Sequence, residues 1–176
     1  IDHCLVGSEM CIRDSDVMSP IGPKARNLNK VFDYPDESIN QLTKWMKADF
    51  IANINEELNT PVDWKDKDLL LDERARSYLD INCGHCHSTS GAANSTGLYL
   101  NITETREKHI GIYKKPVATG RASGNLEYSI VPGKPDESIL LQRMISIDPG
   151  IMMPESGRAL SHTEAIELIE NWILSL

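Results

Sequence analysis

The chain has 176 residues, of which 40% are hydrophobic and 25% charged, so it is long enough for one globular domain with an additional segment. Its formal net charge of -8 argues against nucleic acid or an anionic membrane surface as partners. No apolar run reaches the ~18–20 residues of a membrane-spanning helix, and no signal peptide is recognisable.

Residues 1–15 show neither a hydrophobic period nor turn residues at useful positions, and they do not begin with Met. We expect a non-native or disordered leader there, whose presence would also account for a missing signal peptide. Without this leader, Cys4 and Cys11 leave the cysteine count, and only Cys83 and Cys86 remain. Two cysteines three positions apart indicate a site and not a secreted disulfide framework.

Residues 16–68 are expected to form an N-terminal helical segment and a linker. A helix is predicted over 35–50, with Asp36 or Ser38 as its N-cap. Residues 53–68 are polar and are interpreted as the linker. The apolar face of the predicted helix has helical spacing and comprises Ile39, Leu42, Trp45 and Met46.

Residues 69–176 are expected to form the compact domain. A helix is predicted over 70–82, and the Gly-, Ser-, Thr- and Asn-rich stretch 88–135 predicts a long loop region with room for a small hairpin. The last helix is predicted to follow a capping box at 161–164. Its continuous apolar stripe is Ala165, Ile166, Ile169, Trp172, Ile173 and Leu176.

The pentapeptide PDESI occurs twice, at 35–39 and at 135–139. We interpret it as a shared way of starting a helix, with Pro ahead of a capping Asp or Ser, in preference to a duplicated module. It therefore also predicts a helix over 135–146.

The segment NCGHCH at 82–87 admits three chemistries: a disulfide isomerase site, a zinc site and a covalent haem site. A thioredoxin-like site follows a buried strand and opens a helix, whereas here an amphipathic helix precedes the motif and Gly, Ser and Thr follow it. Zinc takes four ligands, usually in two pairs, and His109 and His162 are isolated.

The haem interpretation uses every residue of the motif. In Cys-x-x-Cys-His, the thiols of Cys83 and Cys86 form thioethers with the porphyrin, and His87 is placed to ligate the iron. Gly84 and His85 are then spacers. We therefore favour one covalently attached haem c as the cofactor.

A sixth iron ligand is expected from the loop 147–157, where Met152 and Met153 precede the last helix. Pro149 and Pro154 exclude a regular helix in this loop. Adjacent Met residues also fill gaps in cores, but beside a haem motif we expect one of the two to ligate iron.

A helix that ends in this motif and crosses a C-terminal helix is the architecture of class I cytochromes c, which the chain resembles over 69–176. The strings IGPKARNLNK and RARSYLDINCGHCH are similar to the C-terminal half of bacterial dihaem c-type proteins, some of which carry a sugar-dehydrogenase-like propeller. Their additional N-terminal haem motif is missing here, so two-haem behaviour is not carried over. The resemblance implies an all-α cytochrome c-like domain, with Met153, the Met before Pro, as the ligand in preference to Met152.

With both axial positions filled, iron has no site for a substrate, so we expect single-electron transfer to or from a partner oxidoreductase or a fused dehydrogenase domain. The alternatives are a peroxidase-type haem enzyme with an open iron site and a thiol-disulfide oxidoreductase. Because covalent haem is installed outside the bacterial cytoplasm, the resemblance implies a periplasmic or extracytoplasmic location.

Other residues are candidates for supporting roles around the haem. Arg143 and Arg158 could neutralise propionates or lie at the surface, and a backbone carbonyl is expected to accept from Nδ1 of His87. The apolar residues expected to pack on the porphyrin, or else in the core, are Leu98, Leu100, Ile110, Ile112, Ile130, Val131, Leu140 and Leu141.

Overall fold

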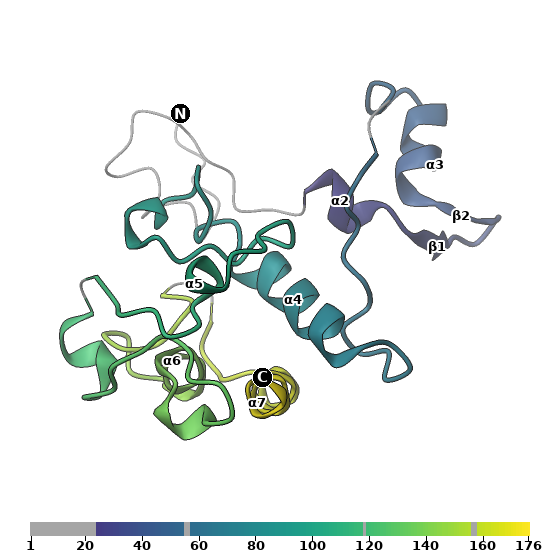
Figure 1. The fold of residues 1–176 in the computed structure, drawn as a ribbon. Helices are drawn as coiled ribbons and strands as arrows, with labels where there is room; N and C mark the ends of the chain where they lie inside the picture. The colour runs from purple at the N-terminus through teal and green to yellow at the C-terminus, as the bar shows by residue number, and fades with distance from the viewer. Residues whose placement is uncertain (1–23, 55–56, 118, 156–157) are drawn as a thin grey trace.

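A computed structural model describes residues 24–54, 57–117, 119–155 and 158–176 (Figure 1). These residues are mostly helical with one small antiparallel sheet, as the predicted helical class requires, and none of their helices is long and apolar enough to cross a membrane. The elements in chain order are α2 (Ala25–Leu28), β1 (Val31–Asp33), β2 (Ser38–Asn40), α3 (Gln41–Lys47), α4 (Leu71–Asn82), η1 (Asn94–Thr96), α5 (Glu107–Ile110), η2 (Gly120–Ser123), η3 (Pro135–Glu137), α6 (Ile139–Ile145) and α7 (Thr163–Ser175).

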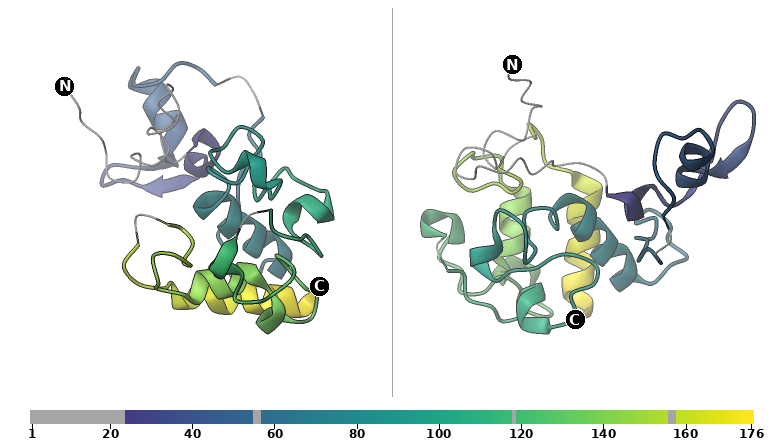
Figure 2. Two further views of the ribbon diagram at one scale, coloured as in Figure 1. Left: turned by 90° about the vertical axis from the view of Figure 1, so that its left-hand side faces the viewer. Right: turned by 90° about the horizontal axis from the view of Figure 1, so that it is seen from above.

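The part of the chain from α4 to α7 is called the main body here. Its core forms where α4 and α7 pack against each other, with α6 beside α7 (Figures 1 and 2). Both long helices bury one apolar face, which confirms the helices predicted over 70–82 and at the C-terminus. The Trp172 indole Nε1 donates to Asp72 Oδ1 at 2.8 Å and ties the two helices together. The largest fully buried side chains of this core include Leu79, Leu100, Ile130, Ile169, Trp172 and Ile173.

The prediction of a capping box at 161–164 is wrong. The N-cap of α7 is His162, in an extended conformation and without a side-chain bond to the helix backbone. Nδ1 of this histidine instead lies 3.1 Å from the Tyr78 hydroxyl on α4, and Trp64 contacts both rings. The start of α7 is therefore fixed by aromatic packing against α4 and the linker.

The helix predicted over 35–50 is shorter and begins later than expected. Asn40 caps α3 by accepting from the backbone N–H groups of Leu42 and Thr43, so neither Asp36 nor Ser38 is the N-cap. Residues ahead of Asn40 instead pair with β1, with Phe32 opposite Ile39. The described residues of 88–135 take part in isolated bridges but do not form the small hairpin allowed for there, and the β1–β2 hairpin in the N-terminal segment was not predicted.

The two PDESI copies adopt different structures, so their interpretation as a shared helix start is wrong for the first copy. In that copy, Ser38 and Ile39 belong to β2. In the second copy, η3 precedes α6, and the buried Ser138 hydroxyl donates to Lys134 O and accepts from Val131 N. Each copy therefore takes the structure that its backbone partners outside the pentapeptide favour: β1 for the first copy, and Val131 N and Lys134 O for the second.

Both α2 and the linker predicted over 53–68 are attached to α4 by specific bonds. Arg26 donates from Nε and Nη2 to the two carboxylate oxygens of Asp80, whose side chain is fully buried. Val62 N donates to the Ser77 hydroxyl at 2.9 Å, and Arg74 Nε donates to Trp64 O at 2.9 Å. The segment is therefore anchored on the polar side of α4.

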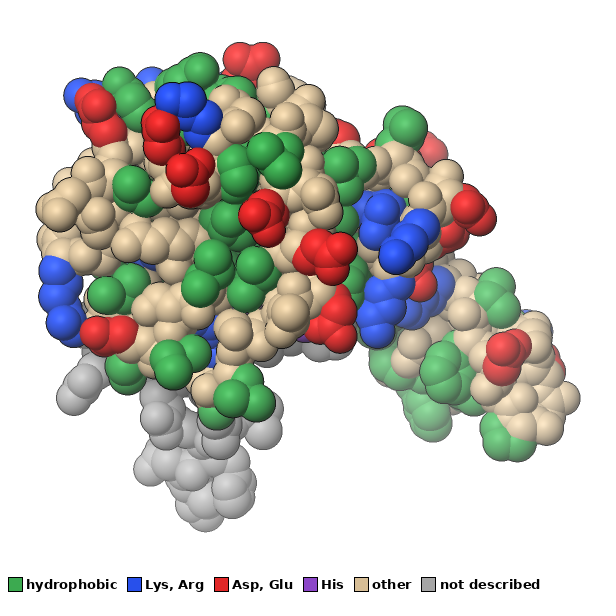
Figure 3. Space-filling view, turned by 90° about the horizontal axis from the view of Figure 1, so that it is seen from below, with side chains coloured by type: hydrophobic (Ala, Val, Ile, Leu, Met, Phe, Trp, Pro, Cys, Tyr) green, Lys and Arg blue, Asp and Glu red, His purple; other side chains and the backbone are tan. Residues whose placement is uncertain are grey.

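Beyond these anchors, the N-terminal segment forms a lobe beside the main body (Figure 3). This lobe carries hydrophobic side chains on its surface, and Val31, Phe32 and Phe50 are each more than half exposed. The domain boundary near residue 69 remains a prediction.

The loop before α5 depends on a buried carboxylate, which makes its stability pH-dependent. Bonds from the Arg106 side chain lower the pKa of Glu104 from its ordinary 4.5 to about 2, and the backbone of Arg106 also donates to it. A carboxyl group whose pKa is lower in the folded state than in the unfolded state stabilises the fold at any pH above the unfolded-state pKa. This stabilisation is lost as the pH falls toward the folded-state pKa. We therefore expect the free energy of unfolding to fall between pH 4.5 and about 2.

The measurement is urea unfolding at several pH values in wild type and in Glu104→Gln. The glutamine variant should lose stability above pH 4.5 and should show a weaker decline between pH 4.5 and 2 than wild type. Equal declines in both proteins would rule out this carboxylate as the cause.

Candidate functional site

The Cys-x-x-Cys-His motif forms one tight turn at the end of α4. Cys83 is the C-cap of the helix, and its N–H donates to Leu79 O at 2.8 Å. Its own carbonyl accepts from the N–H groups of Cys86 at 3.1 Å and of His87 at 2.9 Å. Helical backbone thus passes directly into a turn that holds both thiols and the imidazole within five residues.

Two glycines in and after this turn leave no room for a side chain. A Cβ on the buried Gly84 would lie 2.8 Å from Asp80 O and 3.2 Å from the Asn101 Cα, and a Cβ on Gly91 would lie 2.1 Å from Cys86 O. Gly84 is therefore more than the spacer that the sequence suggests, because α4 and the loop at 101 close over it. Only the contacts of the folded chain reveal this requirement.

Gly84→Ala is expected to destabilise the chain by about 1–3 kcal/mol, because backbone atoms on two sides must move to admit the methyl group. Urea unfolding measures the change. Gly120→Ala is the matched control, since no atom lies within 4 Å of its Cβ position and its cost is only that of a positive φ of 50°. A smaller effect at Gly84 than at Gly120 would contradict the steric argument.

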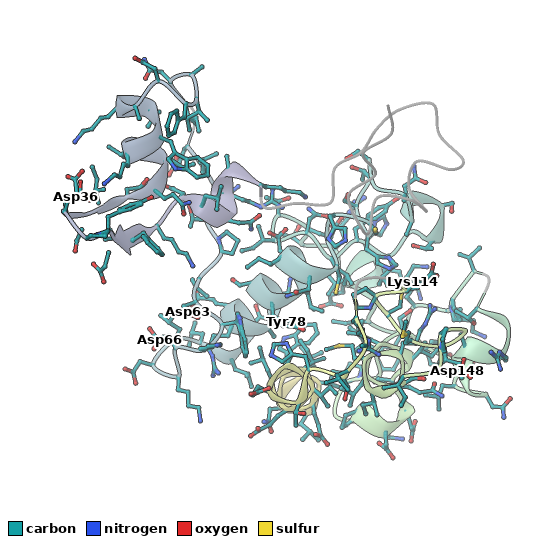
Figure 4. All side chains as sticks on the ribbon, turned by 180° about the vertical axis from the view of Figure 1, so that it is seen from behind. Asp36, Asp63, Asp66, Tyr78, Lys114 and Asp148 are labelled. Atoms are coloured by element: carbon teal, nitrogen blue, oxygen red, sulfur yellow. The ribbon has the colours of Figure 1, made fainter. Side chains whose placement is uncertain are left out.

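The thiol of Cys83 lies in an apolar environment. Burial, with a smaller contribution from Cys86, raises the pKa of Cys83 to about 12. Burial and the neighbouring Cys83 also raise the pKa of Tyr78 to about 12, while the charge of Arg158 opposes this shift. Tyr78 lies on α4 (Figure 4), and its hydroxyl is 3.1 Å from Nδ1 of His162.

His87 is held by the loop that follows it. Its carbonyl accepts from Leu100 N at 2.8 Å, and burial lowers the pKa of its imidazole. The Leu98 backbone opposes that shift, whereas the charge of Arg143 adds to it. Nδ1 of His87 is buried and has no hydrogen-bond partner among the described residues, so Leu98 O is its candidate acceptor. His85, half-buried, also has a pKa lowered by burial.

The loop that carries Met152 and Met153, called the methionine loop, is attached to the end of α6. Met153 N donates to Arg143 O at 2.9 Å, and Arg143 Nε donates to Ile151 O at 2.8 Å. Met152 is buried, with 9% of its surface exposed, whereas Met153 is only half-buried. The two candidates therefore face different surroundings.

Arg158 donates hydrogen bonds to backbone carbonyls at the end of α6. Nη1 donates to Met144 O at 2.6 Å, and Nη2 donates to Ser146 O. The carbonyls at the end of a helix lack intrahelical partners, and this guanidinium supplies donors for them. Arg143 and Arg158 thus have structural roles that sequence reasoning missed, and their predicted contact with propionates remains a prediction.

Two arginines relate the predicted site residues electrostatically. Arg143 donates to Ile151 O in the methionine loop, and besides burial its charge lowers the pKa of His87. Besides burial, the charges of Cys83 and Arg158 both act on the pKa of Tyr78, in opposite directions. The motif and the methionine loop thus share Arg143 as a neighbour, although His87 and Met153 are 66 positions apart.

Seven of the eight predicted apolar contacts belong to the core cluster or its edge, and the eighth, Val131, is buried but is not a member of that cluster. Leu100, Ile110, Ile130 and Leu141 are buried in the core cluster. Leu98, Ile112 and Leu140 are only partly buried and pack on the edge of the same cluster, as Cys83 does. This second set therefore retains apolar surface that could meet a ligand.

Comparisons of the chain with protein-family models, curated proteins and solved structures found no match. The site is therefore interpreted from its own residues. In the described part of the chain, no group of three or more His, Cys, Asp or Glu side chains is placed to hold a metal ion. Two open cavities have no cysteine in their lining, although Ser88 of the second directly follows the motif.

Proposed function

We propose that this chain carries one haem c, bound covalently through Cys83 and Cys86 with His87 and Met153 as axial ligands, and that it transfers single electrons. The proposal includes a cytochrome c-like fold and a relation to bacterial dihaem c-type proteins. It takes the partner to be an oxidoreductase, separate or fused, and the location to be periplasmic or extracytoplasmic.

The observation that supports this proposal is the link that Arg143 makes between the motif and the methionine loop. α4 delivers Cys83, Cys86 and His87 in one turn, and Arg143 links the same region to the backbone of the loop that carries Met153. An imidazole and a thioether from opposite ends of a domain are the donor set of a six-coordinate c-type haem.

The residues present fit such a group. Histidine ligands usually donate their second ring nitrogen to a carbonyl, and the buried Nδ1 of His87 has no other partner among the described residues. That arrangement leaves Nε2 as the nitrogen that would ligate iron. Cys83 lies at the edge of the apolar cluster with Leu98, Ile112 and Leu140, and these side chains would supply an apolar wall.

Electron transfer follows from the closed coordination that this proposal assigns. When bound, the haem supplies reversible one-electron chemistry at its iron, and a Met ligand raises the reduction potential. Within this chain, His87 and Met153 would exclude a substrate from the iron. The hydrogen bonds that anchor α2 and the linker on α4 would hold the motif rigid.

A thiol-disulfide oxidoreductase is less well supported by the geometry. A reactive cysteine sits where its pKa is lowered, commonly at a helix N-terminus. Cys83 is instead at the C-terminal end of α4, and burial raises its pKa to about 12. Both features disfavour a thiolate nucleophile.

A redox titration of the purified, haem-loaded chain tests the proposed function. Electron transfer predicts a single reversible one-electron transition and a negligible rate of peroxide turnover. Fast peroxide turnover by the wild-type chain would show that iron has an open position, and it would favour the peroxidase alternative.

A further inference from the structure

A cavity lies on the side of the main body formed by α5 and the turn that follows it. Its volume is about 650 Å³, and it is broadly open to solvent. No cysteine or methionine lines it, so its chemistry is separate from that of the motif. The lining residues are Gly97, Lys108, His109, Tyr113, Lys114, Lys115 and Tyr128.

Three ammonium groups face this cavity, in a chain whose net charge is -8. Lys115 is neutralised by Glu127 at 2.7 Å. The other two are held by backbone carbonyls: Nζ of Lys108 donates to Tyr113 O at 2.5 Å, and Nζ of Lys114 donates to Lys115 O at 3.3 Å. Neither of these two forms an ion pair with a described carboxylate.

Lys114, labelled in Figure 4, is half-buried, whereas Lys108 is exposed. Burial and the nearby charge of Lys108 both lower its pKa. Two like charges held in one cavity without a counterion destabilise each other, and a partly desolvated ammonium is stabilised by an anion more than one in open water. The arrangement therefore favours a negatively charged occupant.

Aromatic rings form the remaining walls. Tyr113 and Tyr128 meet edge to face with ring centroids 5.7 Å apart, and Lys115 lies 5.8 Å from the centroid of Tyr128. The carbonyl bonds orient the ammonium groups of Lys108 and Lys114. Because both residues line the same cavity, a ligand with two or more charged oxygens has two cations to meet there.

We propose that this cavity binds a small oxyanion with at least two negative charges, through Lys108 and Lys114. A phosphate ester and a polycarboxylate share this chemistry. The inference uses no residue of the haem motif, so it stands or fails independently of the proposed function.

Calorimetric titration of the full-length chain at low ionic strength, with sodium pyrophosphate and with citrate as probes, tests this site. The double variant Lys108→Gln/Lys114→Gln is expected to weaken binding by about tenfold or more, because it removes both unpaired charges. Lys65→Gln/Lys67→Gln removes the same net charge from exposed positions in the linker and should leave affinity nearly unchanged.

The pattern of probes identifies the source of the anion. Binding of pyrophosphate alone indicates a phosphate ester, binding of citrate alone a polycarboxylate, and binding of both a general multivalent site. Absence of binding, equal competition by chloride, or equal weakening in the two double variants would overturn the proposal.

Two-dimensional NMR of the wild-type chain gives a test that needs no variant to fold. Addition of the bound probe should shift the amide signals of Gly97, Lys108, Tyr113, Lys114 and Tyr128 more than those of the linker. Shifts spread evenly over exposed lysines would mean that the anions screen surface charge, and this result would also overturn the proposal.

Discussion

Replacing both Cys83 and Cys86 by alanine is expected to abolish covalent haem attachment completely. Both thiols lie in the turn that ends α4, and thioether formation consumes them. When the chain is produced in cells that install c-type haem, wild type should keep its colour with the polypeptide through acid-acetone extraction. The double variant should lose any colour to the organic phase.

The single variants and a neighbouring substitution provide the controls. Cys83→Ala and Cys86→Ala should each retain one thioether at most, whereas Ser88→Ala next to His87 should bind haem as wild type does. If the double variant still holds haem through extraction, another residue makes the covalent bond and the assignment of the motif is wrong.

Met153→Ala is expected to remove the sulfur ligand from the iron, whereas Met152→Ala should preserve it. Met153 is held at the end of α6 by its N–H bond to Arg143 O, but its side chain remains half-buried and available. Loss of a thioether ligand should lower the reduction potential by about 0.1 V or more, within the ~0.8 V range that axial ligands span. Redox titration and the sulfur-to-iron charge-transfer band of the oxidised chain measure the change.

Met152→Ala separates coordination from packing. Because Met152 is buried, its truncation should cost about 2–5 kcal/mol of stability while the charge-transfer band persists. The opposite pattern, with the band lost only in Met152→Ala, would exchange the roles of the two residues.

The two long helices could be predicted from the sequence because their apolar positions follow the helical period over three turns. α4 and α7 each bury one such face, and the Cys-x-x-Cys-His motif follows α4 directly, as expected. Periodicity is a property of the local sequence, and packing of the two faces reinforces it. This part of the fold needed no tertiary information.

Capping and turn signals were less reliable because distant partners compete for the same groups. The first PDESI copy pairs with β1 and the second leads into α6, although the letters are identical. Likewise, α7 begins at Thr163 after His162 because that imidazole packs with Tyr78 and Trp64, not because Ser161 caps the helix.

The supporting residues of the site were the least predictable. Arg143 and Arg158 were predicted to neutralise propionates or to lie at the surface, yet Arg143 donates to Ile151 O in the methionine loop and Arg158 donates to carbonyls at the end of α6. Gly84 looked like a spacer, yet it is required by the approach of Asp80 O. Each of these roles depends on where a backbone segment from elsewhere in the chain arrives.

Intact-mass spectrometry of the chain, produced where c-type haem is installed, tests the attachment of the cofactor most directly. The predicted result is the mass of the polypeptide plus one haem, with Cys83 and Cys86 both protected from alkylation. A bare polypeptide mass with two alkylated thiols at these positions would contradict it.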